Sequence, residues 1–214
     1  ETMSARKSED KQIEKNLAEC LERGITNVRD AWAPWLPKTQ ELRRRISKGE
    51  IAGPRITQSV VINPAGSYLS EKHQTAGIGR MMRFLVKLAR QKGSDHTKDD
   101  AGVLEFPVEA TPRQIREAVD RAIDKRDAQV IKIVEQYINP AKPKTTLTVM
   151  TMKQLEALAD QAQKRGVQTM MHHSTIDSFR RGIHAGVSSL SHFPMDGALE
   201  QNDIDAIKAS IGTL

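Results

Sequence analysis

Short apolar stretches alternate with amphipathic helical patterns along most of this 214-residue chain. The apolar stretches are rich in the β-branched residues that strands favour, and they cover residues 25–29, 54–62, 129–134, 168–172 and 187–191. The patterns between them repeat apolar residues at intervals of three and four, which is the spacing of one buried helix face. Strands that alternate with such helices predict βαβ units and a parallel sheet. The sequence therefore predicts an α/β fold.

Two of the expected helices have clear start signals. Thr111 and Thr151 each stand three residues before a glutamine, which is the spacing of a capping box, and Pro112 takes the first helical position after Thr111. Gly166 and Gly186 end helical patterns directly before an apolar stretch. These signals indicate that each helix leads from one strand into the next.

The turn after the first strand helps to decide between two fold types that contain a parallel sheet. A doubly wound sheet usually carries a glycine-rich phosphate loop at this point, but here the strand at 25–29 runs into Asp-Ala-Trp-Ala-Pro. The polar residues that could take part in catalysis or metal binding stand instead at the carboxyl ends of several different strands, which is typical of a (β/α) barrel. We therefore predict a partial (β/α)8 TIM-type barrel.

Residues 63–110 interrupt the alternation of strands and helices. Within them, an amphipathic helical pattern over 78–90 is followed by a polar run over 91–100. A connection of this length is usually either functional or mobile. We expect it to be an insertion or lid over the open end of a single domain that spans 1–214.

Composition limits the partners of the chain. The net charge is +6, but basic and acidic residues are interspersed, as over 113–126, which is typical of a solvated helix face rather than of a nucleic-acid-binding stripe. No apolar run approaches the ~20 residues that cross a bilayer, and the first residues lack the apolar core of a secretory signal peptide. We expect a soluble protein with a small-molecule substrate and no nucleic-acid or membrane partner; the compartment stays unassigned.

One lysine and two histidines indicate a metal site. Lys132 lies at the centre of the apolar strand Val130–Val134, where a lone charge costs several kcal/mol unless it is paired, neutralised or bound. His172 and His192 end the next two strands, and neutral imidazoles are common ligands of divalent metals. The alternatives are a lysine that extends to solvent or pairs with an acid, and histidines that are only hydrogen-bonded.

Other polar residues near these strand ends have weaker claims. Tyr137 follows the Lys132 strand, where its hydroxyl would bind a substrate carboxylate or carbonyl. His173 is expected to point away from His172 or to lie beyond the end of the strand. It would then either lie behind a metal ligand or be exposed, and it is not expected to be a ligand itself. Arg29 and Asp30 are expected in an ion pair or a turn, and Asp196 in a helix cap or a turn. Surface positions are expected for His73, His96 and His184.

Taken together, these segments resemble the metal-dependent amidohydrolase superfamily, and most closely its imidazolonepropionase-like and Xaa-Pro dipeptidase-like branch. The resemblance rests on residues 16–30, on Gly53-Pro-Arg-Ile56, on Val130–Ile133 and on 172–192. In the last segment His172 and His192 are 20 positions apart, with Ala-Gly-Val between them.

The resemblance implies a (β/α)8 barrel with divalent metals at the carboxyl ends of its strands, of which this chain supplies strands two to six. It implies that Lys132 is carboxylated by CO2 and bridges two zinc ions, with manganese or cobalt as alternatives, and that His172 and His192 are further ligands. The implied reaction is hydrolysis of amide or peptide C–N bonds by a metal-bridging hydroxide. Dipeptides, N-acyl amino acids and cyclic amides are the expected substrates.

Three parts of the family's pattern do not occur in this sequence. There is no His-x-His pair, residues 65–68 read Ala-Gly-Ser-Tyr where the family has Gly-Gly-His, and the last-strand aspartate that acts as general base is not in the chain. We therefore expect the chain to be a segment that is inactive alone; a truncated, inactive barrel fragment or a binding module is the alternative. The open strand edges of an incomplete barrel predict homo-oligomers.

Overall fold

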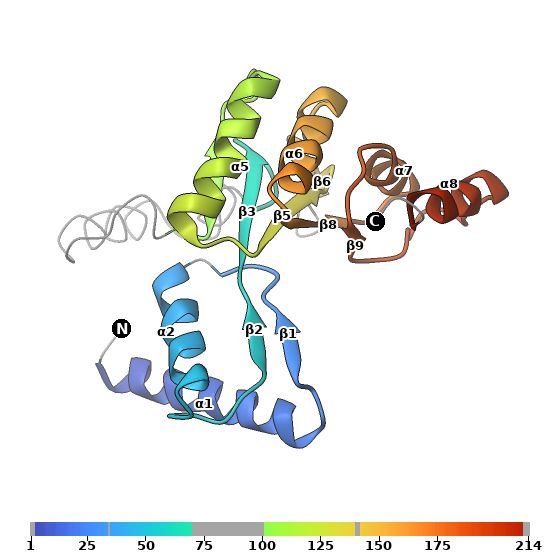
Figure 1. Ribbon diagram of the computed structural model, residues 1–214. Helices are drawn as coiled ribbons and strands as arrows, with labels where there is room; N and C mark the ends of the chain where they lie inside the picture. Colours follow the sequence, from blue (N-terminus) through green and yellow to red (C-terminus); the bar gives the residue numbers. More distant parts are fainter. Residues whose placement is uncertain (1–2, 34, 70–100, 140–141, 212–214) are drawn as a thin grey trace.

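The computed structural model describes residues 3–33, 35–69, 101–139 and 142–211 (Figure 1). In chain order the elements are α1 (Met3–Glu22), β1 (Asn27–Arg29), α2 (Leu36–Ser47), β2 (Arg55–Thr57), β3 (Ser59–Pro64), β4 (Val103–Phe106), α5 (Pro112–Arg126), β5 (Val130–Glu135), β6 (Ile138–Asn139), β7 (Lys142–Thr146), α6 (Met152–Lys164), β8 (Gln168–His173), α7 (Ile176–His184), β9 (Ser189–Leu190) and α8 (Gln201–Ile211). The helical pattern predicted over 78–90 and the polar run over 91–100 lie outside the described residues.

The strands form a parallel sheet, as the sequence predicts. Its order is β4-β3-β5-β8-β9, and all its described pairings are parallel. After Gln58, β3 continues the line of β2, which pairs in parallel with β1. The elements β1, β2–β3, β5, β8 and β9 are therefore the five predicted strands, and the α/β prediction is confirmed.

Two features of the sheet differ from the sequence-based expectation. The short strand β4 lies within the expected insertion at 63–110 and pairs with β3. Beyond β5, strands β6 and β7 form a small antiparallel pair. Strands β4, β6 and β7 are short and depend on pairing with a partner strand. Sequence patterns do not show which segment will be that partner.

Helices cover one face of the sheet. In Figure 1, α5 and α6 lie side by side above the strands, with α7 next to them. Alternate strand residues point toward these helices and are buried in one core: Val60, Ile62, Ile131, Ile133 and Met171. The helices contribute Ile115, Val119, Leu155 and Leu158 to the same core. The intervening residues, which include Lys132, therefore point to the opposite face of the sheet.

The predicted helix starts are present. At α5, the Thr111 hydroxyl accepts from the Gln114 backbone N–H at 3.4 Å, and the Gln114 carboxamide accepts from the Thr111 N–H at 2.8 Å. At α6, Thr151 and Gln154 make the same two bonds at 3.3 and 2.9 Å. Both capping boxes are confirmed.

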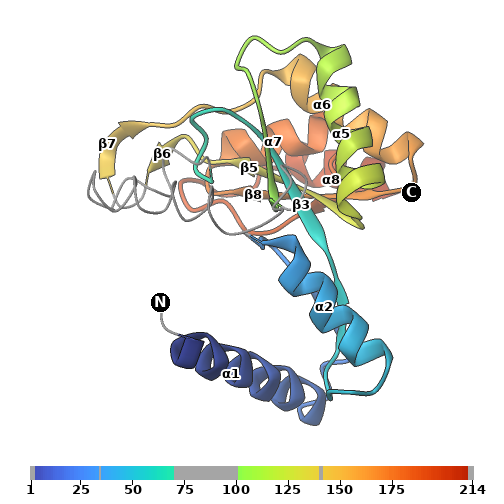
Figure 2. The same ribbon diagram turned by 90° about the vertical axis from the view of Figure 1, so that its left-hand side faces the viewer.

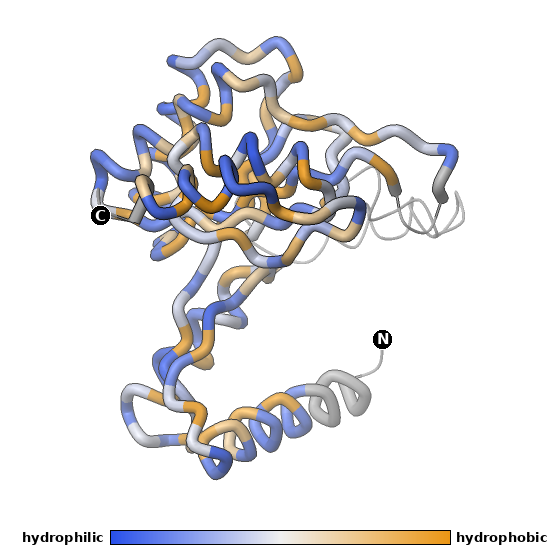
Figure 3. Tube along the Cα trace, turned by 90° about the vertical axis from the view of Figure 1, so that its right-hand side faces the viewer, coloured by the Kyte–Doolittle hydropathy of each residue, from blue (hydrophilic) through white to orange (hydrophobic). Residues whose placement is uncertain are grey.

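The first two helices and strands form a part of the molecule that is connected to the main sheet through β2 and β3 (Figure 2). Along the coloured part of α1, polar and apolar residues alternate at short intervals (Figure 3), as in a helix with one apolar side. Among the described helices, none is both long enough and apolar enough to cross a membrane.

A buried ion pair connects α7 to the carboxyl end of β5. Glu135 is completely buried, and its Oε2 lies 3.1 Å from Nε of Arg181. Its Oε1 accepts from the Met150 N–H at 3.2 Å, and Arg181 also donates to the Met150 carbonyl. The Ser178 hydroxyl donates to the Glu135 carbonyl at 3.2 Å. The two charges are paired with each other, and the backbone carbonyl at the end of β5 accepts a hydrogen bond. This network therefore fixes α7 and the segment before α6 against β5.

Replacement of Arg181 by methionine should lower the free energy of unfolding by about 3 kcal/mol near pH ~7, because Glu135 would keep a buried charge without its partner. Burial already raises the pKa of the Glu135 carboxyl in the folded protein, and loss of the Arg181 charge should raise it further. The folded state then binds the proton more tightly than the unfolded state, so the loss should shrink as the pH falls toward ~4.

Urea denaturation at the two pH values measures this effect. The control is R113M, because Arg113 is 84% exposed and lies 3.9 Å from Glu117, so its loss should cost under about 1 kcal/mol. An equal loss for Arg181→Met at both pH values would show that the charge of Glu135 is not its cause.

Candidate metal centre

Three neighbouring strands bring the predicted ligands to one end of the sheet. In the register of β5 with β8, Lys132 lies opposite Met170 and Val134 lies opposite His172. In the next pair, Met171 lies opposite Leu190, so His192 follows the end of β9 by two residues. The structure thus places His172 and His192 at the carboxyl ends of β8 and β9, and Lys132 in the middle of the adjacent β5.

The two histidines are in direct contact. His172 Nδ1 lies 2.9 Å from His192 Nε2, and the rings are nearly perpendicular, with their centroids 4.7 Å apart. The Lys132 ammonium donates to the Ser191 hydroxyl at 3.2 Å, and Ser191 directly precedes His192. All three predicted ligands therefore meet around one short segment that follows β9.

Burial changes the protonation of this cluster. Lys132 is 5% exposed, and burial followed by the nearby Arg29 charge lowers its pKa to about 8. Burial also lowers the pKa of His172 to about 4, with smaller effects of the same sign from His192, Lys132 and His173. At neutral pH His172 is therefore neutral, and its imidazole has one nitrogen lone pair free to bind a cation.

The donor set fits a divalent cation when Lys132 is carboxylated. Two imidazole nitrogens suit zinc, and the neutral amine of a lysine is the form that reacts with CO2 to give a two-oxygen ligand. In the part of the chain that the structure describes, no group of three or more His, Cys, Asp or Glu side chains is arranged to hold a metal. No carboxylate pairs with Lys132 among those same residues, so the predicted alternative of a lysine–acid pair is not what the structure shows.

Of the other described histidines, His173 lies beside the cluster, with its ring centroid 6.3 Å from that of His192, and His184 lies on α7. His173 is on the helix-covered face, completely buried, with its ring centroid 5.4 Å from that of Phe179. The prediction that it points away from His172 is confirmed, and the alternative that it is exposed is wrong, because α7 covers it. His184 is exposed on α7, as predicted, and lies 3.6 Å from Glu156. Residues His73 and His96 lie outside the described parts of the chain.

The hydroxyl of Tyr137 donates to Oδ2 of Asp177, at the start of α7, at 3.0 Å. Burial is the main cause that raises the pKa of Tyr137 to about 12, so the phenol keeps its proton at neutral pH. A substrate oxygen would therefore have to replace Asp177 as acceptor. The predicted role of Tyr137 in substrate binding stays a prediction.

Asp30 has the turn role that was one of its two predicted roles, and Asp196 has the predicted capping role. The Asp30 carboxylate accepts from the Trp32 N–H at 3.0 Å and forms a turn after β1. The Asp196 carboxylate accepts from the Ile176 N–H at 2.7 Å and so caps the first turn of α7.

Three residues of the cluster were missed by sequence reasoning. Gln136, directly after β5, places its Oε1 3.0 Å from His172 Nε2. The Tyr68 ring lies 12° from parallel to the His172 ring, with the centroids 6.2 Å apart. Ser191 is the third, through its bond to Lys132. For two of them the available signal was position, because Gln136 directly follows β5 and Ser191 directly follows β9.

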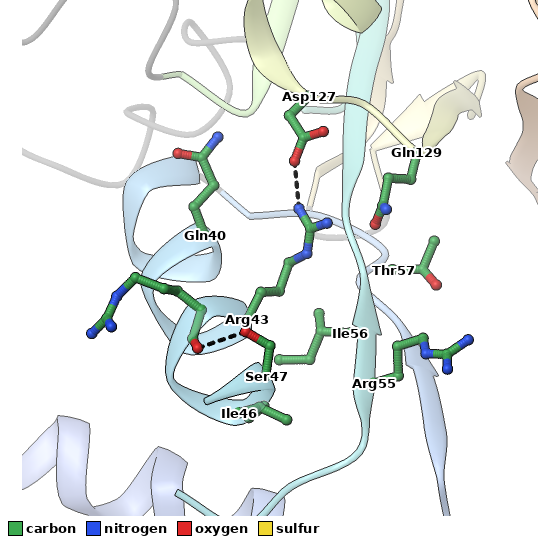
Figure 4. A pocket seen from close by; sticks show the side chains of 10 residues that line it. Gln40, Arg43, Ile46, Ser47, Arg55, Ile56, Thr57, Asp127 and Gln129 are labelled. Atoms are coloured by element: carbon green, nitrogen blue, oxygen red, sulfur yellow. Dashed lines mark hydrogen bonds and ion pairs between the residues drawn. The ribbon is translucent and has the colours of Figure 1, made fainter. Parts of the chain in front are cut away.

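A separate cavity of about 770 Å³ lies at the opposite end of the strands (Figure 4). It is lined by Gln40, Arg43, Arg44, Ile46, Ser47, Arg55, Ile56, Thr57, Asp127 and Gln129. Arg43 points to Asp127 at 2.6 Å (Figure 4). Arg44 pairs with Glu41 at 2.7 Å. Because this end of a barrel usually serves stability rather than chemistry, the cavity is not the candidate site.

Comparisons with known proteins show the fold of this chain. No family model matches it, and no curated protein matches it. Solved structures do match: an A. niger ochratoxinase with TM-score 0.66 and 16% identity over 92% of this chain, and phenylurea hydrolase B with TM-score 0.66 and 20% identity over 92%. A Xaa-Pro dipeptidase with bound methionine matches with TM-score 0.60 and 22% identity over 87%.

The chain spans 42%, 43% and 41% of those three proteins, respectively. Such neighbours are members of the amidohydrolase superfamily, and the parallel sheet of this chain matches a part of their TIM barrels. The predicted fold class, a partial TIM-type barrel, is thereby confirmed.

In metal-free protein, substitution of Lys132 by methionine should raise the free energy of unfolding by about 2 kcal/mol near pH ~7. The folded-state pKa of Lys132 is about 8, below its unfolded value, so the folded protein binds this proton less tightly. The charged lysine therefore costs stability below that pKa, and the cost disappears as the pH rises toward ~10.

Denaturation with urea from pH ~7 to pH ~10 measures the difference, with the exposed Lys153→Met on α6 as the control that should change little. If the gain from Lys132→Met were the same at every pH, the buried charge would not be its cause.

Proposed function

We propose that this chain is part of a metal-dependent hydrolase that cleaves amide or peptide C–N bonds. The observation that carries the proposal is the convergence of Lys132, from the middle of β5, with His172 and His192 at the carboxyl ends of the next two parallel strands. This is the end at which barrels of this kind perform chemistry. Support comes from the hydrolases with the same fold, which include a Xaa-Pro dipeptidase, phenylurea hydrolase B and molinate hydrolase.

In the proposed site, His172 and His192 would bind divalent cations through neutral ring nitrogens. Lys132 would be carboxylated and would bridge two cations, zinc in the first instance and manganese or cobalt as alternatives. When bound, such cations polarise a carbonyl group and lower the pKa of water. Carboxylation forms a bond between the neutral Lys132 nitrogen and the carbon of CO2, and the proton that leaves the nitrogen passes to solvent.

The residues around these ligands would orient the substrate. Tyr137 is proposed to donate its hydroxyl hydrogen to a substrate carboxylate or carbonyl, which would then replace Asp177. Phe193 and Met195, one and three residues after His192, are 81% and 82% exposed, and we propose that they offer apolar surface to the substrate. Dipeptides, N-acyl amino acids and cyclic amides are the proposed substrates.

One observation favours a second candidate, in which this chain is a barrel fragment or binding module that is inactive alone. Among the described residues, no group of three or more His, Cys, Asp or Glu side chains is arranged to hold a metal, so Lys132 and the two histidines are the proposed ligands. The 214-residue chain alone would then bind at most one cation and would not turn over substrate. We propose that turnover needs a first-strand histidine pair and a general-base aspartate from the rest of a complete barrel.

Substitution of Lys132 by alanine, in a protein with a complete barrel around these residues, should remove both metal and turnover. Lys132→Glu should retain part of both, because it keeps a carboxylate ligand. His172→Asn should lower the rate by orders of magnitude at an unchanged fold, since only a ligand at the strand end is lost. Metal content by elemental mass spectrometry and a library of dipeptides and N-acyl amino acids measure these effects.

Two metals per chain in Lys132→Ala would contradict a bridging role of Lys132. Rapid phosphoester cleavage without metal-dependent amide turnover would contradict the proposed reaction.

We also propose that the isolated chain self-associates. In the described sheet, β9 pairs with β8 on one side, which leaves its other edge open to a second strand. Light scattering at micromolar concentration should give a mass above that of one 23.9 kDa chain. A stable monomer would contradict this proposal.

A further inference from the structure

The side-chain amide of Gln136 makes two hydrogen bonds that together fix its orientation. Its Nε2 donates to the carbonyl of Ile138 at 2.9 Å, and its Oε1 lies 3.0 Å from Nε2 of His172. An amide nitrogen only donates and an amide oxygen only accepts. The bond to the Ile138 carbonyl therefore decides that the oxygen end of Gln136 faces His172.

This orientation determines where His172 carries its hydrogen. Because Gln136 Oε1 can only accept, His172 Nε2 must donate and so must carry the hydrogen. A neutral imidazole has one N–H, which leaves the lone pair on Nδ1. That lone pair points at His192 Nε2, which is 2.9 Å away and donates to it in the metal-free pair.

We propose that Gln136 is a positioning residue that holds His172 in the Nε2–H tautomer and presents its Nδ1 to the metal. The part of this inference that concerns the metal rests on the proposed function, whereas the tautomer does not. A cation between the rings would take the place of the hydrogen on His192 Nε2. The exposed His192 ring can carry that hydrogen on Nδ1 after exchange with solvent.

Two neighbours make this arrangement stable. The bond from Gln136 to Ile138 spans two residues, so a local turn holds the amide in place without any longer-range contact. The Tyr68 ring stacks on the His172 ring, 12° from parallel and with the centroids 6.2 Å apart. Partners that orient a metal-bound histidine typically contribute about 10- to 100-fold in metal affinity.

The test compares Gln136→Leu, which removes the acceptor, with Gln136→Glu, which keeps one. The matched control is Gln163→Leu, an exposed glutamine on α6 far from the cluster. Nuclear magnetic resonance of the His172 ring nitrogens in the metal-free chain reports the tautomer directly. Wild type, Gln136→Glu and the control should show Nε2–H, whereas Gln136→Leu should show a mixture of tautomers.

The dissociation constant for zinc, measured by competition with a chelating dye, gives the second readout. Gln136→Leu should weaken zinc binding about 10- to 100-fold, and Gln136→Glu and Gln163→Leu should stay within a few-fold of wild type. Circular dichroism of all four proteins should be the same, which separates positioning from misfolding.

A wild-type His172 that carries its hydrogen on Nδ1 would overturn the inference, as would an unchanged tautomer in Gln136→Leu. A wild-type chain with the Nε2–H tautomer but no zinc binding would support the role of Gln136 in His172 geometry and would count against the proposed function instead.

Discussion

The candidate site depends on the parallel register between β5 and β8. With Lys132 opposite Met170 and Val134 opposite His172, the lysine and the histidine point to the face that the helices leave open. A slip of one residue would turn either side chain toward the helices and would expose apolar residues now buried against them. The core formed by Ile131, Ile133 and Met171 therefore also holds the proposed ligands in place.

Two charged residues are buried three positions apart on β5, and the structure treats them differently. Glu135, on the helix side, has Arg181 and the Met150 backbone as partners, so its charge is compensated. Lys132, on the open side, has one neutral hydrogen bond, to Ser191. A buried charge that serves structure is normally paired, whereas an uncompensated one is more typical of a functional site. This contrast is why Lys132, and not Glu135, is the centre of the proposal.

Sequence patterns predict the parts of this fold that are specified locally. The β-branched runs gave the five parallel strands, and the Thr-x-x-Gln spacing gave the starts of α5 and α6. The lone charge inside an apolar strand predicted Lys132, and position at strand ends predicted His172 and His192; the structure brings the three together.

Contacts between distant residues were not accessible in this way. Gln136 and His172 are 36 positions apart, and Glu135 and Arg181 are 46 apart, so only the folded sheet brings either pair together. Strand β4 has the same origin, because four residues form a strand here only through pairing with β3. His173 was not recognised as a core residue, since its burial depends on α7 packing over the strand end.

The central claim is that Lys132 becomes a carboxylated metal ligand, and ¹³C nuclear magnetic resonance tests it most directly. Zinc-loaded protein with a complete barrel, prepared in ¹³C-labelled bicarbonate, should show one carbamate signal that is absent from the Lys132→Met variant. A carbamate signal that persists in Lys132→Met, or zinc-loaded wild-type protein without such a signal, would contradict the account.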